Sequence, residues 1–409
     1  MLSVRCASEN VSSCLIKKND KRGVKMNRNN NQSNISLPQF QNPFREKVSA
    51  CWEIFSKGEA KLRQLIDQKA DSESITAQLD ALLTPAFDTV YAEVGFNGEK
   101  YDLILNLEGD WSRLFALNYF QKKAPESVLQ YWNILIGRQS HGQNMENYQL
   151  RINDNTVCAG NIQLWTAWEN QKAKVCLYCK DLVPLLSERE NEAYWFAYVM
   201  LDYAVGELAE MKYIDELEIL RAPYGQPALT LVQLMPHFMQ QLDLSRDELF
   251  DANRYCELYC GYQMKPDEAS QDGLRTDVFA GSSCFVYLLN EFYSGENRIM
   301  DTFQADGITA GYFCFPLYGF EGDNRGAQIL DFRDDAAEMI EKTAGQDSFT
   351  YIGGASGINY GYLDFIAWDL NTVLDAAVSV FEKSGIDHVM FHSFRRDSDS
   401  ITLFDHTSK

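Results

Sequence analysis

The chain has 409 residues and a formal net charge of −21, with 45% apolar and 13% aromatic residues. Its apolar content suffices to bury a core, which excludes a wholly disordered protein, and its length predicts two globular units. Residues 47–409 carry 29 basic and 55 acidic side chains, a net charge of −26. A body this acidic repels phosphate backbones, so nucleic acid binding is disfavoured.

The first 42 residues are predicted to form a disordered tail, because residues 22–42 are rich in Asn, Ser and Gln and poor in apolar side chains. Both Met1 and Met26 are candidate starts of translation. The N-terminus lacks the apolar stretch of a secretory signal, and nowhere do about 18 apolar residues run together as a membrane span requires. These features favour a cytoplasmic protein without a membrane segment.

Helical spacing dominates residues 43–84, where Val48, Trp52 and Phe55 share a face and a break near Asp71 predicts two helices. Residues 85–227 mix both patterns and are predicted to form an α+β domain. Its expected strands are 101–107, 132–136, 162–168, 174–179 and 217–220, and its expected helices are 112–123 and 190–211.

Residues 228–307 have mainly helical patterns and are predicted to form a connector. Residues 308–409 then alternate in the order strand, helix, strand, strand, helix, strand, which is the ferredoxin-like βαββαβ pattern. The segments are 310–320, 334–342, 349–353, 360–368, 370–384 and 388–394. The sequence therefore predicts an α+β protein with two sheet-containing domains joined by a helical connector, the C-terminal domain being ferredoxin-like.

Ten cysteines are scattered through apolar segments, a distribution typical of reduced, buried thiols. Cys176 and Cys179 have the CxxC spacing of zinc and redox sites, but they lie on a predicted strand, which sends them to opposite faces. Cys256 and Cys260 are four residues apart on a predicted helix and share a face. The geometry would allow these two thiols to bind a metal or form a redox pair, but two buried, packed cysteines are the favoured interpretation.

His388 and His392 share one face of a predicted strand but lie about 13 Å apart at about 3.3 Å per residue, too far to chelate one ion together. The glycine-rich run 353–357 lacks the Lys-Ser/Thr ending of a phosphate-binding loop and favours a hairpin turn. The motifs GxSxG, HExxH, SxxK and GxxxxGK[ST] are absent. We therefore expect neither a metal nor another cofactor.

A polar cluster marks the ends of two predicted strands, where functional sites tend to lie. Arg138, Gln139 and His141 follow one strand, and Glu108 ends a neighbouring one. His141 beside a carboxylate is able to act as a general base, whereas the alternative is an ordinary hydrogen-bonded loop.

The predicted C-terminal sheet has two apolar faces. Alternation in the strand 360–368 separates a face that packs under the predicted helices from a second face. Two helices cover only one face, so the second face must meet another part of the chain or a partner protein. The residues predicted for this second face are Tyr362, Asp364, Trp368, His392 and Phe394.

A resemblance lies in residues 105–139, LNLEGDWSRLFALNYFQKKAPESVLQYWNILIGRQ. This stretch is similar to the first part of a group of poorly characterised bacterial α+β proteins. Residues 327–404 resemble the ferredoxin-like domains that accompany them and, more distantly, the regulator of ribonuclease E activity B. The resemblance implies an α+β fold and a bacterial cytosolic setting. Arg138 and Gln139 match its motif, which has no assigned role.

These patterns together favour a non-catalytic binding or regulatory protein that acts through a protein partner with a basic surface. One alternative is a hydrolase-like enzyme that uses a pocket formed by Glu108, Arg138 and His141. Another, suggested only by acidity, is an immunity or anti-toxin protein. The enzyme requires those three side chains to converge on one concave pocket.

Overall fold

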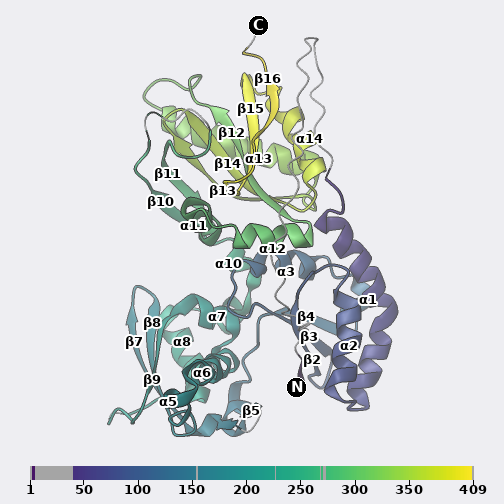
Figure 1. Cartoon of the computed structure of the whole chain (residues 1–409), viewed down its shortest axis with the longest axis vertical. Helices are drawn as coiled ribbons and strands as arrows, with labels where there is room; N and C mark the ends of the chain where they lie inside the picture. The colour runs from purple at the N-terminus through teal and green to yellow at the C-terminus, as the bar shows by residue number, and fades with distance from the viewer. Residues whose placement is uncertain are drawn as a thin grey trace, which may run out of the picture. The chain divides into compact units, whose positions relative to one another are not determined.

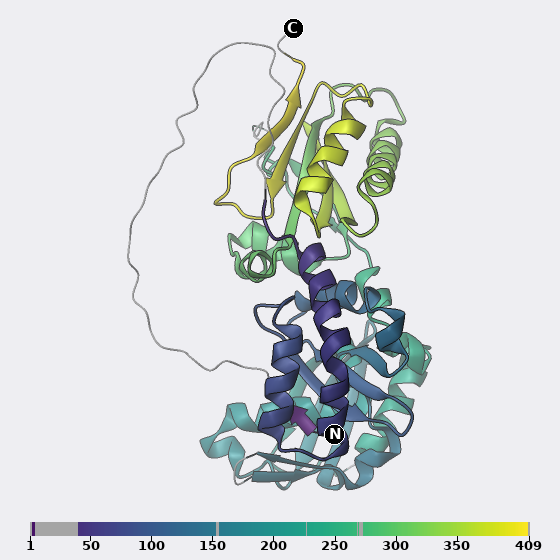
Figure 2. The same cartoon turned by 90° about the vertical axis from the view of Figure 1, so that its right-hand side faces the viewer.

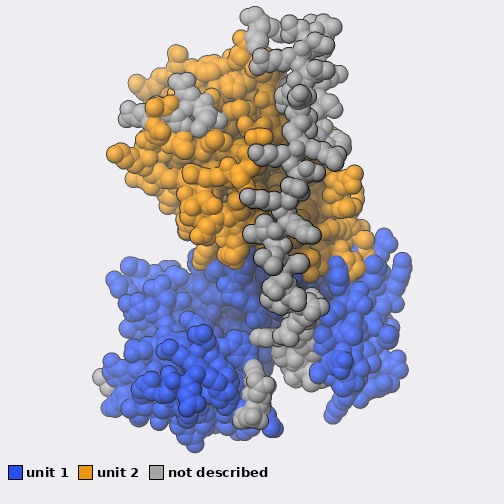
Figure 3. All heavy atoms as spheres, viewed as in Figure 1, with its two compact units in different colours: residues 1–6, 51–84, 89–258 blue, residues 7–50, 85–88, 259–409 orange. Residues whose placement is uncertain are grey.

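The computed structural model describes residues 2–4, 40–152, 155–225, 227–267, 269 and 273–407. It is a mixed α+β structure with 44% helix and 26% strand. Its described residues form two compact units (Figure 3): unit 1 holds 2–4, 51–84 and 89–258, and unit 2 holds 40–50, 85–88 and 259–407. Most of the predicted tail, residues 5–39, lies outside the described residues.

Unit 1 contains a four-stranded sheet in the order β1-β2-β3-β4, a three-stranded sheet in the order β7-β8-β9 and a β5-β6 hairpin (Figure 1). Its strands are β1 (Leu2–Val4), β2 (Tyr91–Phe96), β3 (Tyr101–Asn106), β4 (Trp132–Ile136), β5 (Gln149–Ile152), β6 (Asn155–Cys158), β7 (Ile162–Glu169), β8 (Lys172–Cys179) and β9 (Ile214–Leu220).

Helices surround both sheets of unit 1. They are α2 (Ser72–Leu83), α3 (Arg113–Lys122), α4 (Glu126–Leu129), α5 (Leu185–Glu188), α6 (Glu190–Val205), α7 (Glu207–Tyr213), α8 (Leu231–Leu242), α9 (Arg246–Phe250) and α10 (Ala252–Cys256), with short 3₁₀ turns η1 (Gly142–Asn147) and η2 (Ala159–Asn161). Helix α1 (Phe44–Asp67) begins among residues of unit 2 and ends among those of unit 1.

The N-terminal helix pair follows the predicted pattern. Asp71 separates the two helices and caps α2, because its carboxylate accepts the backbone N–H of Ser74 at 2.8 Å. Trp52 of α1 stacks on Phe120 of α3 with ring centroids 4.3 Å apart. The predicted break between two helices is confirmed.

Strands β3 and β4 are parallel, with α3 and α4 between them in the chain. Their C-terminal ends therefore lie at the same edge of the sheet, where side chains from the two following loops come together. The chain leaves β3 through Leu107 and Glu108 and leaves β4 through Gly137 and Arg138.

The segment 190–211, predicted as one helix, is two helices that meet at Gly206. This glycine has a φ of 89°, a conformation that other residues rarely adopt, and a Cβ atom there would collide with the ring of Phe250. The break turns α7 away from the axis of α6. The prediction of a single helix was wrong because glycine is tolerated in helical patterns and its required φ is not visible in them.

Unit 2 is built on a seven-stranded antiparallel sheet in the order β10-β11-β13-β14-β12-β15-β16. Its strands are β10 (Cys260–Gln263), β11 (Val278–Ser283), β12 (Thr309–Pro316), β13 (Phe349–Gly357), β14 (Tyr360–Ala367), β15 (His388–Ser393) and β16 (Ile401–Asp405). Its helices are α11 (Val286–Ser294), α12 (Arg298–Asp306), α13 (Arg325–Ala344) and α14 (Leu370–Phe381).

One face of this sheet packs under α13 and α14, which lie side by side in Figures 1 and 2. Phe313 of β12 is at the centre, with ring centroids 4.4 Å from Phe365 of β14 and 5.6 Å from Phe381 of α14. Leu363 and Phe391 belong to the same buried cluster. The predicted division of β14 and β15 into two faces is therefore confirmed.

The second face of the sheet is covered by other parts of unit 2. Trp368 lies 5.8 Å from Phe44, at the start of α1, and Phe394 lies 5.6 Å from Phe292 of α11. Trp368 and Phe394 are both almost fully buried. The sequence left open whether this face meets another part of the chain or a partner protein. In the structure, other segments of the same chain cover it.

Two regions differ from the predicted elements. The segment predicted as a helical connector contains strands β10 and β11, which extend the C-terminal sheet. The run 353–357, predicted as a turn, lies in β13, and a bulge of this strand between Tyr351 and Gly353 directly precedes it. Close backbone approach explains this run, because a Cβ atom on Gly353 would collide with the carbonyl of Ser282 in β11.

Trp368→Ala is expected to lower the free energy of unfolding of unit 2 by about 3–5 kcal/mol, as large core truncations do. The substitution removes a buried ring and its 2.9 Å hydrogen bond to Thr350. Urea denaturation followed by circular dichroism measures the change. The control Trp165→Ala, at a half-buried position of β7, should cost less than half as much. Equal losses would contradict the internal interface.

Candidate functional site

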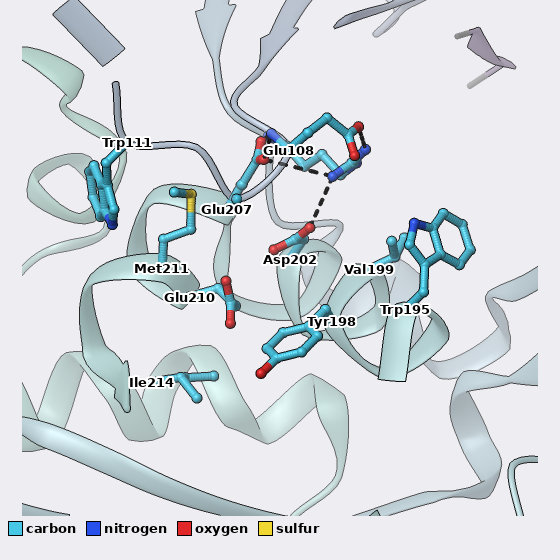
Figure 4. Close-up of a pocket in the computed structure, with 12 residues that line it drawn as sticks. Glu108, Trp111, Trp195, Tyr198, Val199, Asp202, Glu207, Glu210, Met211 and Ile214 are labelled. Carbon is cyan, nitrogen blue, oxygen red and sulfur yellow. Dashed lines mark hydrogen bonds and ion pairs between the residues drawn. The ribbon is translucent and has the colours of Figure 1, made fainter. Parts of the chain in front are cut away.

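A pocket of about 370 Å³ lies in unit 1 where the loops after β3 and β4 meet α6 and α7 (Figure 4). Its wall combines charged, aromatic and aliphatic side chains. The lining residues are Glu108, Gly109, Trp111, Arg138, Trp195, Tyr198, Val199, Asp202, Glu207, Glu210, Met211 and Ile214.

Arg138 lies at the centre of the charged wall and is 6% exposed. Its Nε donates to Glu93 at 3.1 Å, its Nη1 donates to Asp202 at 3.1 Å, and its Nη2 donates to Glu108. Glu207 lies 3.8 Å from Nη1. A buried charge is stable only when it is paired and hydrogen-bonded, and these contacts hold the guanidinium in one position.

Glu207 ties the helix α7 to the ends of both parallel strands. Its carboxylate accepts the backbone N–H of Leu107 at 3.3 Å, of Glu108 at 2.7 Å and of Arg138 at 3.0 Å. In return, the backbone N–H of Glu207 donates to the carbonyl of Arg138 at 2.9 Å. The loops that form this side of the pocket are therefore held through their backbone.

The charges around Arg138 are not balanced. Although burial opposes a charged guanidinium, the carboxylates of Glu207, Asp202, Glu108 and Glu93 raise the pKa of Arg138 above its ordinary range. Burial, followed by the charges of Glu207 and Glu210, raises the pKa of Asp202 well above its usual value. Burial also raises the pKa of Glu207, against the effects of Arg138 and the backbone donors. The site has more acidic groups than one guanidinium can neutralise.

Glu210 is the least satisfied acid of the pocket. The residue is 7% exposed, its carboxyl has no ion pair or hydrogen bond to the described part of the chain, and its oxygens are not among the fully enclosed polar atoms, so they are open to the pocket. Burial and the neighbouring charge of Glu207 raise the pKa of Glu210 to about 8, so its carboxyl is mostly protonated at pH 7. Figure 4 shows this carboxyl pointing into the pocket.

Aromatic rings form another part of the wall. Trp195 and Tyr198 project from one side of α6, three residues apart, and Trp111 comes from the loop after β3. Tyr198 is 41% exposed, which leaves the pocket accessible to solvent along its ring. The faces of such rings attract cations.

The structure brings together two of the four residues in the predicted polar cluster. Glu108 and Arg138 form an ion pair, whereas the Gln139 side chain donates to the carbonyls of Ile136 at 3.2 Å and Gly137 at 2.8 Å.

His141 does not line the pocket. Its ring stacks on Tyr203 with centroids 4.4 Å apart, and burial lowers the pKa of its imidazole. The backbone N–H of His141 also donates to the carbonyl of Tyr203 at 2.8 Å, so this loop is tied to the end of α6. The convergence of Glu108, Arg138 and His141 on one pocket, which the enzyme alternative required, is therefore not found in this pocket.

Sequence reasoning missed Asp202, Glu207 and Glu210, which lie more than 60 residues after Arg138. It assigned the segment that contains them to one helix and described only its apolar face. The available signal was three acidic residues within an otherwise apolar stretch, beside a glycine.

The candidates from the C-terminal sheet form an internal network. Arg275 is fully buried and donates to Asp364, and the Tyr362 hydroxyl donates to Asp277. The ring of His392 stacks on Tyr312 at 5.4 Å, and its Nε2 lies 3.0 Å from the carbonyl oxygen of Ser398. These residues are interior groups of unit 2, so they do not form the partner-binding surface that was the other alternative.

The cysteines of the described part are free thiols. Cys179 is buried and Cys176 half-buried, on opposite faces of β8, whereas Cys256 ends α10 and Cys260 begins β10, so this second pair does not share a helix. Within the described residues, no group of three or more His, Cys, Asp or Glu side chains is placed to hold a metal ion. None of the helices described combines the length and apolar character that crossing a bilayer requires.

No family model matches the chain, and comparison with curated proteins and with solved structures finds no significant match. Function is therefore inferred from the pocket itself.

Arg138→Met is expected to lower the free energy of unfolding by about 3–5 kcal/mol, because it leaves buried carboxylates without their counter-charge. The loss should grow as the pH rises from about 5 to 8, since Asp202 and Glu207 already have raised pKa values and must then ionise unpaired. Denaturation at several pH values measures it. Arg189→Met, on an exposed arginine, is the control and should change little. A loss that is independent of pH would argue against this electrostatic role.

Glu210→Gln should flatten the pH dependence of stability. The pKa of Glu210 in the folded state, about 8, is above its ordinary value of 4.5, so its contribution is fully present below about pH 4.5 and is lost as the pH rises through 8. Thermal unfolding between pH 4.5 and 8.5 should show a smaller decline in the variant than in the parent. Glu190→Gln, on an exposed acid of α6, should keep the parental slope. Identical slopes for Glu210→Gln and the parent would refute this assignment.

Proposed function

We propose that this is a non-catalytic binding protein whose pocket in unit 1 receives a positively charged group of a protein partner. The observation that carries the proposal is the charge of the pocket wall, which contains four acidic side chains and one guanidinium. Glu108, Asp202, Glu207 and Glu210 line the pocket together with Arg138. A cationic group that enters would relieve the repulsion among these acids.

The net charge of the chain after its first 46 residues supports the same proposal. Residues 47–409 have a net charge of −26, which attracts basic partners over distances longer than a contact. The aromatic rings at the rim add a further attraction for a cation. An immunity or anti-toxin protein would act in this way, by covering a basic surface of another protein.

A second candidate function is a hydrolase-like enzyme that uses the acids of this pocket. Glu210 favours it, because a carboxyl with a pKa of about 8 keeps its proton at pH 7, as a general acid must. His141 has no role in such an enzyme, because its side chain does not line the pocket. Turnover of chromogenic esters, phosphates or glycosides that is lost in Glu210→Gln would favour the enzyme.

We also propose that residues 309–393 form a ferredoxin-like module. The support is the chain order β12, α13, β13, β14, α14, β15 together with the sheet order β13-β14-β12-β15. We propose as well that the chain is related to the poorly characterised bacterial proteins that its sequence resembles, and that it acts in the bacterial cytosol. This resemblance assigns no role to any residue of the pocket.

A peptide with one lysine among Gly and Ser residues is expected to bind the intact protein more tightly than the same peptide with norleucine or glutamate. Tyr198→Ala should weaken that binding about tenfold by removing a ring from the pocket wall. Fluorescence anisotropy of labelled peptides measures both effects.

The matched control for this measurement is Tyr224→Ala, which removes an exposed tyrosine of unit 1 outside the pocket and should leave the affinity unchanged. Raising the salt concentration should weaken binding of the lysine peptide. Equal affinity for the lysine and norleucine peptides would overturn the proposed function.

A further inference from the structure

We propose that the group taken by this pocket is an alkylammonium, which pairs with the carboxylate of Glu210 against the ring of Tyr198. This inference rests on the proposed function and names the chemistry of its ligand. Its sources are a lysine side chain of a protein or a free small amine.

The first step of the argument is that Glu210 alone among the pocket acids of the described chain has no partner. Glu108 and Asp202 accept hydrogen bonds from Arg138, and Glu207 accepts three backbone N–H groups. Glu210 is more than nine-tenths buried and points into the cavity (Figure 4). A carboxyl in this position ionises more readily beside a positive charge, so a cationic ligand is able to pair with it.

The second step concerns the kind of cation. A metal ion needs several protein ligands, and in the described residues no group of three or more acidic, His or Cys side chains is placed to provide them. An organic cation needs less, because one carboxylate and an aromatic face suffice to hold it. Glu210 and Tyr198 provide that set, since both line the pocket and the charge of Glu210 acts on the Tyr198 hydroxyl.

The third step favours an ammonium over a guanidinium. A guanidinium binds best through a planar fork that engages paired acceptors, and Arg138 already occupies the acceptors of Glu108 and Asp202. The single carboxylate that is left suits a compact ammonium. Val199, Met211 and Ile214 line the same pocket and provide an apolar wall for the methylene chain of an amine.

Binding should be linked to the release of a proton. The charged or titratable groups that face Glu210 across the pocket are Tyr198 and Asp202 of α6, Glu207 of α7, and Glu108 and Arg138 from the strand ends. Because the pKa of its carboxyl is about 8, this group must lose about one proton at pH 7 to pair with an ammonium. Affinity should therefore increase from pH 6 to 8, while the amine itself remains charged.

The test is isothermal titration calorimetry on the intact protein with three blocked peptides that differ only at a central lysine, arginine or norleucine. We expect the lysine peptide to bind about tenfold more tightly than the arginine peptide. Titrations at pH 7 in buffers of different ionisation enthalpy should show the release of about one proton. Glu210→Gln should abolish proton release and lower affinity at least about tenfold, and Glu190→Gln should preserve both.

The outcomes separate this inference from the proposed function. No binding of any cationic probe would overturn both. Binding of the lysine peptide without proton release, or with unchanged affinity in a correctly folded Glu210→Gln variant, would overturn the inference and leave the proposed function standing. Tighter binding of the arginine peptide would also overturn the inference.

A final arm uses n-butylamine to distinguish the two sources of the amine. Weaker binding of n-butylamine than of the lysine peptide supports a protein partner. Equal affinity supports a free amine, which preserves the inference and overturns the protein partner of the proposed function.

Discussion

The guanidinium of Arg138 is the interaction on which the arrangement of unit 1 depends. Each of its three nitrogens donates to a different element: Nε to Glu93 of β2, Nη1 to Asp202 of α6 and Nη2 to Glu108 after β3. Arg138 itself follows β4. One side chain therefore holds helix α6 and the loops after β3 and β4 against the sheet. Its removal would leave several carboxylates buried without a counter-charge.

The same interactions that hold unit 1 together leave its pocket acidic. Arg138 compensates the acids that it contacts, and the backbone compensates Glu207 through three N–H groups. Nothing in the described part of the chain compensates Glu210, which stays neutral by keeping its proton. Such an uncompensated group is unfavourable for stability, and groups with strongly shifted pKa values are found both at functional sites and in structural ion-pair networks.

The elements that could be recognised in the sequence were those whose pattern of apolar and polar side chains lies within one short segment. The alternation of Tyr101 to Leu105 indicates β3, and the opposite parity of Leu363 and Trp368 assigns both faces of β14. Strands β10 and β11 were missed because they are short, with four and six residues, and because β11 is identified by its pairing with β13, about 70 residues later in the chain, while β10 pairs with β11.

The site was predictable only in the half that lies at strand ends. Glu108 and Arg138 follow consecutive parallel strands. The C-terminal ends of parallel strands lie at the same edge of a sheet, so these two side chains are expected to lie close together. Asp202 and Glu210 come from helices whose position depends on tertiary packing and on the bend at Gly206. The place of His141 was not predictable, because its ring and its backbone N–H contact Tyr203, which is more than 60 residues later in the chain.

The backbone contacts of Glu207 have a consequence for how this protein is able to evolve. Because α7 is joined to both loops through main-chain N–H groups, substitutions in those loops leave the donors in place. The indole of Trp111, in one of these loops, is therefore not required for the backbone junction itself. Descendants of this chain would be able to change the side chain at this position while inheriting the same scaffold.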